Sequence, residues 1–183
     1  MARQPRQAET VWNQSEKVNA ELFAFTYGAL VVKLIKELES LTKVNETLEQ
    51  MGYNIGVRLI DDFLSKNDVN CEELKDTADA IAKHGFKVYL GITCDVVMGD
   101  DQKEFSLIMT DNPMTEYVEM REGYGELCYC NIICGVIRGA LQMLKYESKV
   151  SIVRDTLKND DCTEIKVTIL SRKVDEYEPD EGA

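Results

Sequence analysis

The chain has 183 residues, of which 44% are hydrophobic and 30% charged, a size and composition typical of one globular domain and unlike a disordered segment. Its 21 basic and 33 acidic side chains give a net charge of -12. This charge argues against a nucleic-acid partner, because binding to phosphates relies on Lys and Arg. It also disfavours attraction to an anionic membrane unless the basic residues gather on one face.

The first twenty residues and the cysteines indicate a reducing, cytoplasmic compartment. Charged side chains such as Arg3, Arg6 and Glu9 interrupt the N-terminal segment, so we expect no secretory signal peptide. No window of the chain approaches the roughly 20 consecutive apolar residues of a membrane-spanning helix. We therefore expect the six cysteines to be free thiols.

Helical periodicity dominates the first half of the chain. Apolar residues recur at steps of three and four from Glu21 to Leu41 and again from Leu48 to Phe63. A third helix is predicted over residues 71–92, after a cap at Asp68 or Asn70. We expect a flexible N terminus over residues 1–18, a single domain over residues 19–172 and an acidic C-terminal tail over residues 173–183.

The second half of the chain mixes helical and strand periods. Residues 105–109 read as a strand, and after an Asp-Asn-Pro turn signal residues 115–120 are predicted to pair back as a hairpin. Residues 131–149 are predicted to form a helix, and residues 150–157 and 164–170 a second hairpin. This order predicts an α+β fold, in which helices cover a small antiparallel sheet.

The residues needed for most catalytic sites are absent from the sequence. His84 is the single histidine, so a His-rich metal site cannot form and a Ser-His-Asp triad has only one candidate base. We expect His84 to lie at the surface or an interface. Cys128, Cys130 and Cys134 do not have a zinc or iron–sulfur spacing, which favours small buried side chains between a strand and a helix. We expect no catalytic residue, no metal and no enzymatic turnover.

Cys71 stands out because of its place on the third predicted helix. At about 100° per residue, it shares one apolar face with Leu74, Ala78, Ile81 and Gly85. Two members of that face are small, which leaves free volume beside the thiol. Either neighbouring side chains fill that volume and Cys71 is a plain core residue, or the thiol lies at the mouth of a hydrophobic slot suited to an acyl chain.

Two pairs of glycines also mark close packing. Gly52 and Gly56 lie one turn apart on the second predicted helix, and Gly135 and Gly139 lie one turn apart on the late helix. This spacing predicts that a backbone or a ligand approaches each helix closely.

Five segments resemble subunit three of the trafficking protein particle (TRAPP) complex. They are residues 21–31, 51–64, 77–93, 134–143 and 153–167, and they include G-Y-N-I-G-V-R-L-I and R-G-A-L-Q-M. The resemblance implies helices packed on a twisted antiparallel sheet and a homodimer or heterodimer formed through the early helices. It also implies a palmitoyl chain thioester-linked to Cys71 in a buried hydrophobic tunnel that a small residue, here Gly85, keeps open.

We assign the lining of that tunnel to residues of the second and third helices: Leu59, Phe63, Leu74, Ala78, Ile81 and Gly85. The resemblance further implies a non-enzymatic core subunit that tethers vesicles between the endoplasmic reticulum and the Golgi apparatus. Its partners would be other TRAPP subunits, and its location would be cytoplasmic, peripheral on cis-Golgi and ER-derived membranes. The assembly would also promote nucleotide exchange on a Rab-type GTPase, with Asp175, Glu176 and Glu178 of the tail reaching toward the nucleotide site.

Two other functions remain open at this point. Haem-nitric-oxide domains share a related fold with the family, so the chain could be a haem or small-molecule sensor. A haem iron would need an axial ligand, and His84 is the single histidine in the sequence. Alternatively, Cys71 could acylate itself or transfer an acyl group to an acceptor, although the chain supplies no evident base beside it.

Overall fold

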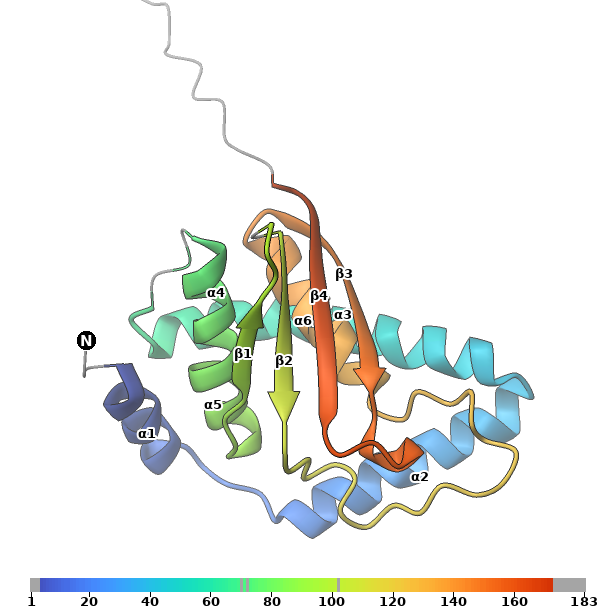
Figure 1. Ribbon diagram of the computed structural model, residues 1–183. Helices are drawn as coiled ribbons and strands as arrows, with labels where there is room; N and C mark the ends of the chain where they lie inside the picture. Colours follow the sequence, from blue (N-terminus) through green and yellow to red (C-terminus); the bar gives the residue numbers. More distant parts are fainter. Residues whose placement is uncertain (1–3, 70, 72, 102, 173–183) are drawn as a thin grey trace, which may run out of the picture.

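The computed structural model describes residues 4–69, 71, 73–101 and 103–172, and shows an α+β fold with helices covering one face of an antiparallel sheet (Figure 1). The helices in chain order are α1 (Gln4–Gln14), α2 (Ala20–Leu38), α3 (Leu41–Lys66), α4 (Leu74–Ala80), α5 (Phe86–Leu90) and α6 (Asn131–Met143). A π-helical turn (Ile81–Gly85) joins α4 to α5, and a 3-10 turn (Thr156–Lys158) lies between the last two strands.

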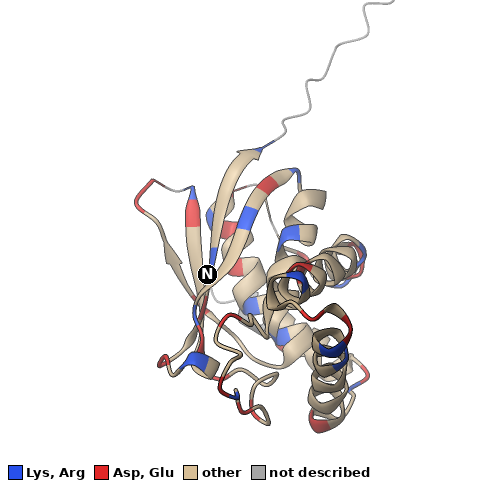
Figure 2. Ribbon diagram, turned by 90° about the vertical axis from the view of Figure 1, so that its right-hand side faces the viewer, with Lys and Arg blue, Asp and Glu red and all other residues tan. Residues whose placement is uncertain are grey.

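The sheet has the spatial order β1-β2-β4-β3, and neighbouring strands are antiparallel. Its strands are β1 (Asp95–Met98), β2 (Glu104–Met109), β3 (Tyr146–Arg154) and β4 (Thr163–Arg172). Along β2, Phe105, Leu107 and Met109 are buried while the residues between them are half-buried, as expected when one face of a sheet packs on a core. Seen from the side, the long helices lie together on one side of the strands (Figure 2). The predicted fold class is confirmed.

Helix α6 lies between the sheet and α3, and contacts β3 as well as α3. Its close contact with α3 depends on glycines from both helices: Gly52, Gly56, Gly135 and Gly139. A Cβ added to Gly52 would overlap the Ile132 carbonyl of α6, and one added to Gly139 would overlap the Tyr53 carbonyl of α3. The close approach predicted from the glycine spacing is therefore that of two helix backbones.

Helices α2 and α3 and the hairpin of β3 and β4 confirm the elements predicted in those regions. The Asn19 side chain accepts a hydrogen bond from the Leu22 amide at 2.9 Å, which caps the start of α2. Glu39 has a φ of 51°, in the left-handed region, and this residue separates α2 from α3.

The predicted helix over residues 131–149 is too long, because its last four residues belong to β3. Lys145 has a φ of 67°, and this left-handed residue ends the helical run directly after α6. From Tyr146 onward, burial alternates with a period of two, and Tyr146, Ser148 and Val150 face the core. The helical stripe of α6 hides this change of period, since the strand begins three residues after the helix ends.

Residues 115–120 do not form the predicted strand. β2 already pairs with β1 along one edge and with β4 along the other, so no free edge remains for a hairpin partner. The segment instead forms turns, such as the one closed by the bond from the Val118 amide to the Thr115 carbonyl at 3.0 Å. The hairpin partner of β2 is β1, a short strand that sequence reasoning missed.

The helix predicted over residues 71–92 begins later and is interrupted. α4 starts at Leu74, and the π-helical turn separates it from α5.

At the N terminus, residues 4–14 form α1, where flexible chain was expected. Ala8 of this helix is buried, and Trp12 packs on Gly91. The acidic tail lies outside the described residues.

Candidate functional site

An apolar cavity of about 630 Å³ lies between α2, α3, the π-helical turn, α5 and α6. The side chains that line it are almost all hydrocarbon. They include Tyr27, Leu59, Ile60, Phe63, Ile81, Gly85, Phe86, Tyr89 and Ile137. The two tyrosine hydroxyls are occupied elsewhere: Tyr27 donates to the Tyr129 carbonyl, and Tyr89 donates to Asp62 at 2.9 Å. Burial raises the pKa of Tyr27, so its phenol is neutral at pH 7. The cavity suits a hydrocarbon ligand.

Four of the six predicted tunnel residues line this cavity: Leu59, Phe63, Ile81 and Gly85. The remaining two, Leu74 and Ala78, pack into the main core instead. The π-helical turn, which holds Ile81 and Gly85, has a longer repeat than an α-helix, so the stripe does not continue in phase from α4 into this turn.

Gly85 is the glycine among the residues that line the cavity, and the space around its Cα is open. A Cβ added to it would meet nothing nearer than the Ala80 carbonyl oxygen at 3.9 Å. Its backbone is helical, with φ -60° and ψ -56°, so the position does not need glycine for conformational reasons. The absent side chain leaves space that belongs to the cavity.

Cys71 lies in the segment before α4 and packs against a small apolar cluster of Ile60, Phe63 and Ala80. Ile60 and Phe63 also line the cavity, so the half-buried Cys71 packs on a cluster that borders the cavity without lining it itself. The helix-phase argument placed Cys71 on α4, whereas its proximity to the cavity comes from packing between elements. Burial raises the pKa of the Cys71 thiol, a hydrogen bond from Thr77 opposes this, and the charge of Asp76 raises it further. The resting thiol is therefore neutral.

The cavity opens to solvent between α2 and α3, where Phe23 and Ile55 are each 44% exposed. Three further apolar residues of α2 are each at least half exposed: Leu22, Phe25 and Val32. Tyr117 of the loop after β2 lies beside Phe25, with ring centroids 5.3 Å apart. This part of the surface is more apolar than a solvated helix face needs to be.

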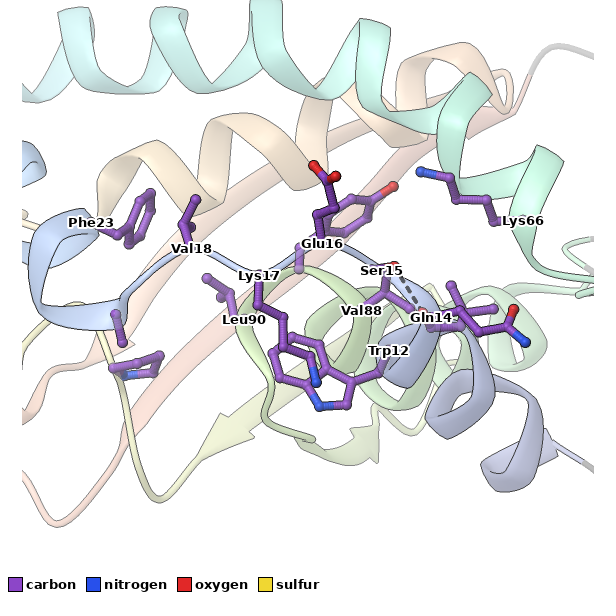
Figure 3. A pocket seen from close by; sticks show the side chains of 14 residues that line it. Trp12, Gln14, Ser15, Glu16, Lys17, Val18, Phe23, Lys66, Val88 and Leu90 are labelled. Atoms are coloured by element: carbon purple, nitrogen blue, oxygen red, sulfur yellow. Dashed lines mark hydrogen bonds between the residues drawn. The ribbon is translucent and has the colours of Figure 1, made fainter.

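A second pocket, of about 830 Å³, lies between α1, the segment that follows it and α5 (Figure 3). Its lining is mixed: Trp12, Val88 and Leu90 stand beside Lys17, Glu16 and Lys66 (Figure 3). Lys17 lies 4.5 Å from the centroid of the Trp12 ring, and Lys66 pairs with Asp62 at 2.6 Å. Its charged side chains make it a poorer container for an acyl chain than the apolar cavity.

The structure corrects the placement of His84, which is 2% exposed and therefore not a surface residue. Burial lowers its pKa, and neither ring nitrogen has a hydrogen-bond partner among the described residues. His84 does not line the apolar cavity, which removes it as an axial ligand for a group bound there.

The cysteines at the start of α6 are packing residues. Cys130 and Cys134 are fully buried, and burial raises the pKa of the Cys130 thiol to about 12. Within residues 4–69, 71, 73–101 and 103–172, no cluster of three or more His, Cys, Asp or Glu side chains could hold a metal ion. Asp175, Glu176 and Glu178 lie outside the described residues.

Sequence reasoning did not assign the cavity residues of α2, α5 and α6, such as Tyr27, Phe86 and Ile137. Their helical periodicity marks them as buried, but periodicity does not show which buried residues face a void. Thr77, which is fully buried next to Cys71, was also missed. A polar residue on an otherwise apolar helix face is the signal that could have identified it.

No helix within the described residues has both the length and the apolar character needed to cross a membrane.

Comparison with known proteins identifies the family. Residues 23–168 match the profile described as transport protein particle (TRAPP) component. The trafficking protein particle complex subunit 3 of Dictyostelium discoideum is 49% identical over 162 residues, which cover 87% of each chain. A crystal structure of subunit 3 from Naegleria fowleri, covalently bound to palmitic acid, is 44% identical with a TM-score of 0.82, covering 86% of this chain and 98% of that one.

A more distant likeness extends to an H-NOX protein from S. oneidensis in the Fe(II)NO state, which is 13% identical with a TM-score of 0.53 and covers 89% of this chain and 90% of that one. At this identity the likeness concerns the fold alone. The profile match and the 49% identity both span most of the chain. This chain is thus a member of the transport protein particle (TRAPP) component family and falls among its subunit 3 proteins.

Proposed function

We propose that this chain is a non-enzymatic core subunit of a TRAPP tethering assembly and carries a palmitoyl chain, thioester-linked to Cys71, in the apolar cavity. The observation that carries the proposal is the packing of Cys71 against the cluster of Ile60, Phe63 and Ala80, two members of which also line that cavity. The Naegleria relative that is covalently bound to palmitic acid supports the same ligand here.

The expected energy of the buried chain is large enough to keep it in place. Each buried methylene contributes about 0.8 kcal/mol, so roughly ten of them contribute about 8 kcal/mol. A free thiol with a raised pKa is a poor nucleophile, so we expect attachment to depend on an activated acyl donor and to be long-lived once formed. The lipid would be part of the folded core.

The test is the intact mass of the protein purified from a eukaryotic host. We expect an increment of one palmitoyl group that neutral hydroxylamine removes, since hydroxylamine cleaves thioesters. The variant Cys71→Ser should lack the increment, while Cys128→Ser, at the other half-buried cysteine, should keep it. An increment that survives in Cys71→Ser would contradict attachment at this residue.

The proposed assembly contact is a dimer, with a second copy or a related subunit, through the exposed apolar residues of α2. Leu22, Phe25 and Val32 follow one face of this helix. Burying such a face against a similar helix removes the apolar surface from water.

We further propose that the assembled complex, and not this chain alone, promotes nucleotide exchange on a Rab-type GTPase during ER-to-Golgi transport. The chain would then be cytoplasmic and peripheral on cis-Golgi and ER-derived membranes. Residues 173–183 would act near the nucleotide site. Deletion of these residues should slow exchange by the reconstituted assembly, and an unchanged exchange rate would contradict a role for the tail.

A second candidate function, acyl transfer from Cys71 to an acceptor, shares the same thiol. It is distinguished by turnover: a lipid carrier takes up one acyl group per chain, whereas a transferase consumes many equivalents of acyl donor. Release of more than one equivalent of coenzyme A per chain in the presence of an acceptor would favour the transferase.

A further inference from the structure

A buried hydroxyl lies beside the thiol proposed to carry the lipid. Thr77, on the first turn of α4, is fully buried. Its Oγ1 lies 2.9 Å from the Glu73 carbonyl oxygen and 3.2 Å from the Cys71 carbonyl oxygen. The Glu73 carbonyl already accepts a hydrogen bond from the Thr77 amide at 2.9 Å. The hydroxyl is therefore not needed to satisfy Glu73 and is available to Cys71.

Cys71 depends on such contacts because regular structure does not hold it. α3 ends at Lys66 with Asn67 as its cap, and α4 begins at Leu74. Thr77 links α4 to the main chain of residue 71 through the contact of its hydroxyl with the Cys71 carbonyl oxygen, and the same hydroxyl lowers the pKa of the Cys71 thiol. One side chain thus holds the backbone of Cys71 and favours the ionised form of its sulfur.

The charged groups around the thiol do not replace this contact. Asp76 of α4 disfavours a thiolate. From α5, Tyr89 packs on the same cluster as Cys71 and donates its hydroxyl to Asp62 of α3. The cation near that carboxylate, Lys66, is paired with it at 2.6 Å. Thr77 is therefore the described group whose interaction favours the ionised sulfur.

We propose that Thr77 is a positioning residue for the acylation of Cys71, an inference that rests on the proposed lipid attachment. Its hydroxyl fixes residue 71 against α4 and donates a hydrogen bond to the sulfur as negative charge develops there. In the reaction with a long-chain acyl-coenzyme A, the Cys71 sulfur attacks the acyl carbonyl carbon and a new carbon–sulfur bond forms. The bond to the coenzyme A sulfur breaks, and the Cys71 proton passes through water to the departing thiolate.

The first experiment measures the rate of Cys71 acylation by palmitoyl-coenzyme A in unacylated protein. Thr77→Val keeps the shape but removes the hydroxyl, and we expect a rate about tenfold to a hundredfold lower, the size of one lost hydrogen bond to a charged atom. Thr77→Ser should restore most of the rate. Thr47→Val is the matched control, because Thr47 also donates to the carbonyl four residues earlier, at 2.7 Å, but on the exposed side of α3.

The second experiment measures alkylation of Cys71 by iodoacetamide between pH 7 and 10, with the other five cysteines substituted by serine or alanine. We expect the pH midpoint of alkylation to be higher in Thr77→Val than in the parent and in Thr77→Ser. A merely structural role for Thr77 would lower thermal stability without moving this midpoint.

The outcomes separate this inference from the proposed function. If the parent protein is acylated and Thr77→Val matches it in both rate and midpoint, Thr77 has no positioning role and the lipid site stands. If the parent is not acylated at Cys71, the lipid attachment is wrong, and an unmoved alkylation midpoint overturns the Thr77 contact as well. A slower, shifted Thr77→Val that Thr77→Ser restores supports the inference.

Discussion

Gly85 determines how much of the cavity is free, and the substitution Gly85→Leu tests this directly. The first atom of the new side chain would meet nothing nearer than the Ala80 carbonyl oxygen at 3.9 Å. The backbone of Gly85 already has helical angles. The leucine side chain can therefore extend from the π-helical turn into the cavity of about 630 Å³ without displacing the backbone.

The expected loss of lipid affinity follows from the volume exchanged. Leucine adds about four carbon atoms and so takes the place of about four methylene groups of the acyl chain. At about 0.8 kcal/mol for each, the chain loses roughly 3 kcal/mol of binding free energy, which is about a hundredfold. The free energy of unfolding should not fall, because glycine is about 1 kcal/mol less favourable than alanine within a helix.

The assay compares the fraction of acylated protein by intact mass, together with urea unfolding of the same samples. Gly85→Leu should have little or no acyl group while unfolding at the same or a higher urea concentration. Gly85→Ala, which adds one carbon, should retain most of the lipid. Full acyl occupancy in a stable Gly85→Leu protein would refute the assignment of this cavity to the lipid.

Three further predictions concern packing, pH and assembly. Gly52→Ala should lower the free energy of unfolding by about 1–3 kcal/mol, because the added Cβ would overlap the Ile132 carbonyl. Gly125→Ala, in open space, should change this free energy by less than about 0.5 kcal/mol. Equal effects of the two substitutions in urea unfolding would contradict the close contact of α3 with α6. Burial raises the pKa of the Cys94 and Cys130 thiols from 9.0 to about 12, so the folded chain keeps protons that the unfolded chain loses, and stability should fall as pH rises from 9 toward 12. The expected slope is about 1.4 kcal/mol per pH unit for each thiol and is shallower in Cys130→Ala; a flat profile in urea titrations at pH 8, 10 and 11 would refute it. The double substitution Phe25→Asp and Val32→Asp should convert a dimer into a monomer in sedimentation velocity. Lys33→Asp on the same helix should leave the dimer intact. An unchanged mass for the double variant would contradict a dimer through α2.

The type and order of several elements could be predicted from local signals. The apolar periodicity and the Asn19 cap define α2, and the alternation along β4 defines a strand with one buried face. The errors occur where tertiary pairing overrides local pattern. Residues 115–120 have a strand-like sequence but no free edge to pair with, since β1 and β4 already occupy both edges of β2.

The candidate site was predicted in part and for an incomplete reason. The stripe on the third predicted helix included Ile81 and Gly85, which line the cavity. It also included Leu74 and Ala78, which pack in the main core, because the π-helical turn changes the phase between the two pairs. Residues spaced on a helical wheel share a direction only while the helix keeps its repeat.

Local sequence patterns establish the building blocks of the fold: helices with apolar stripes, strands with one buried face, and glycines where two backbones meet. These properties depend on residues close together in the chain, so periodicity reveals them. The position and lining of the void depend instead on tertiary packing. A cavity is the space that side chains from α2, α3, α5 and α6 leave unfilled, and the packing of Cys71 against the cluster that holds Ile60 and Phe63 joins residues that no local pattern relates.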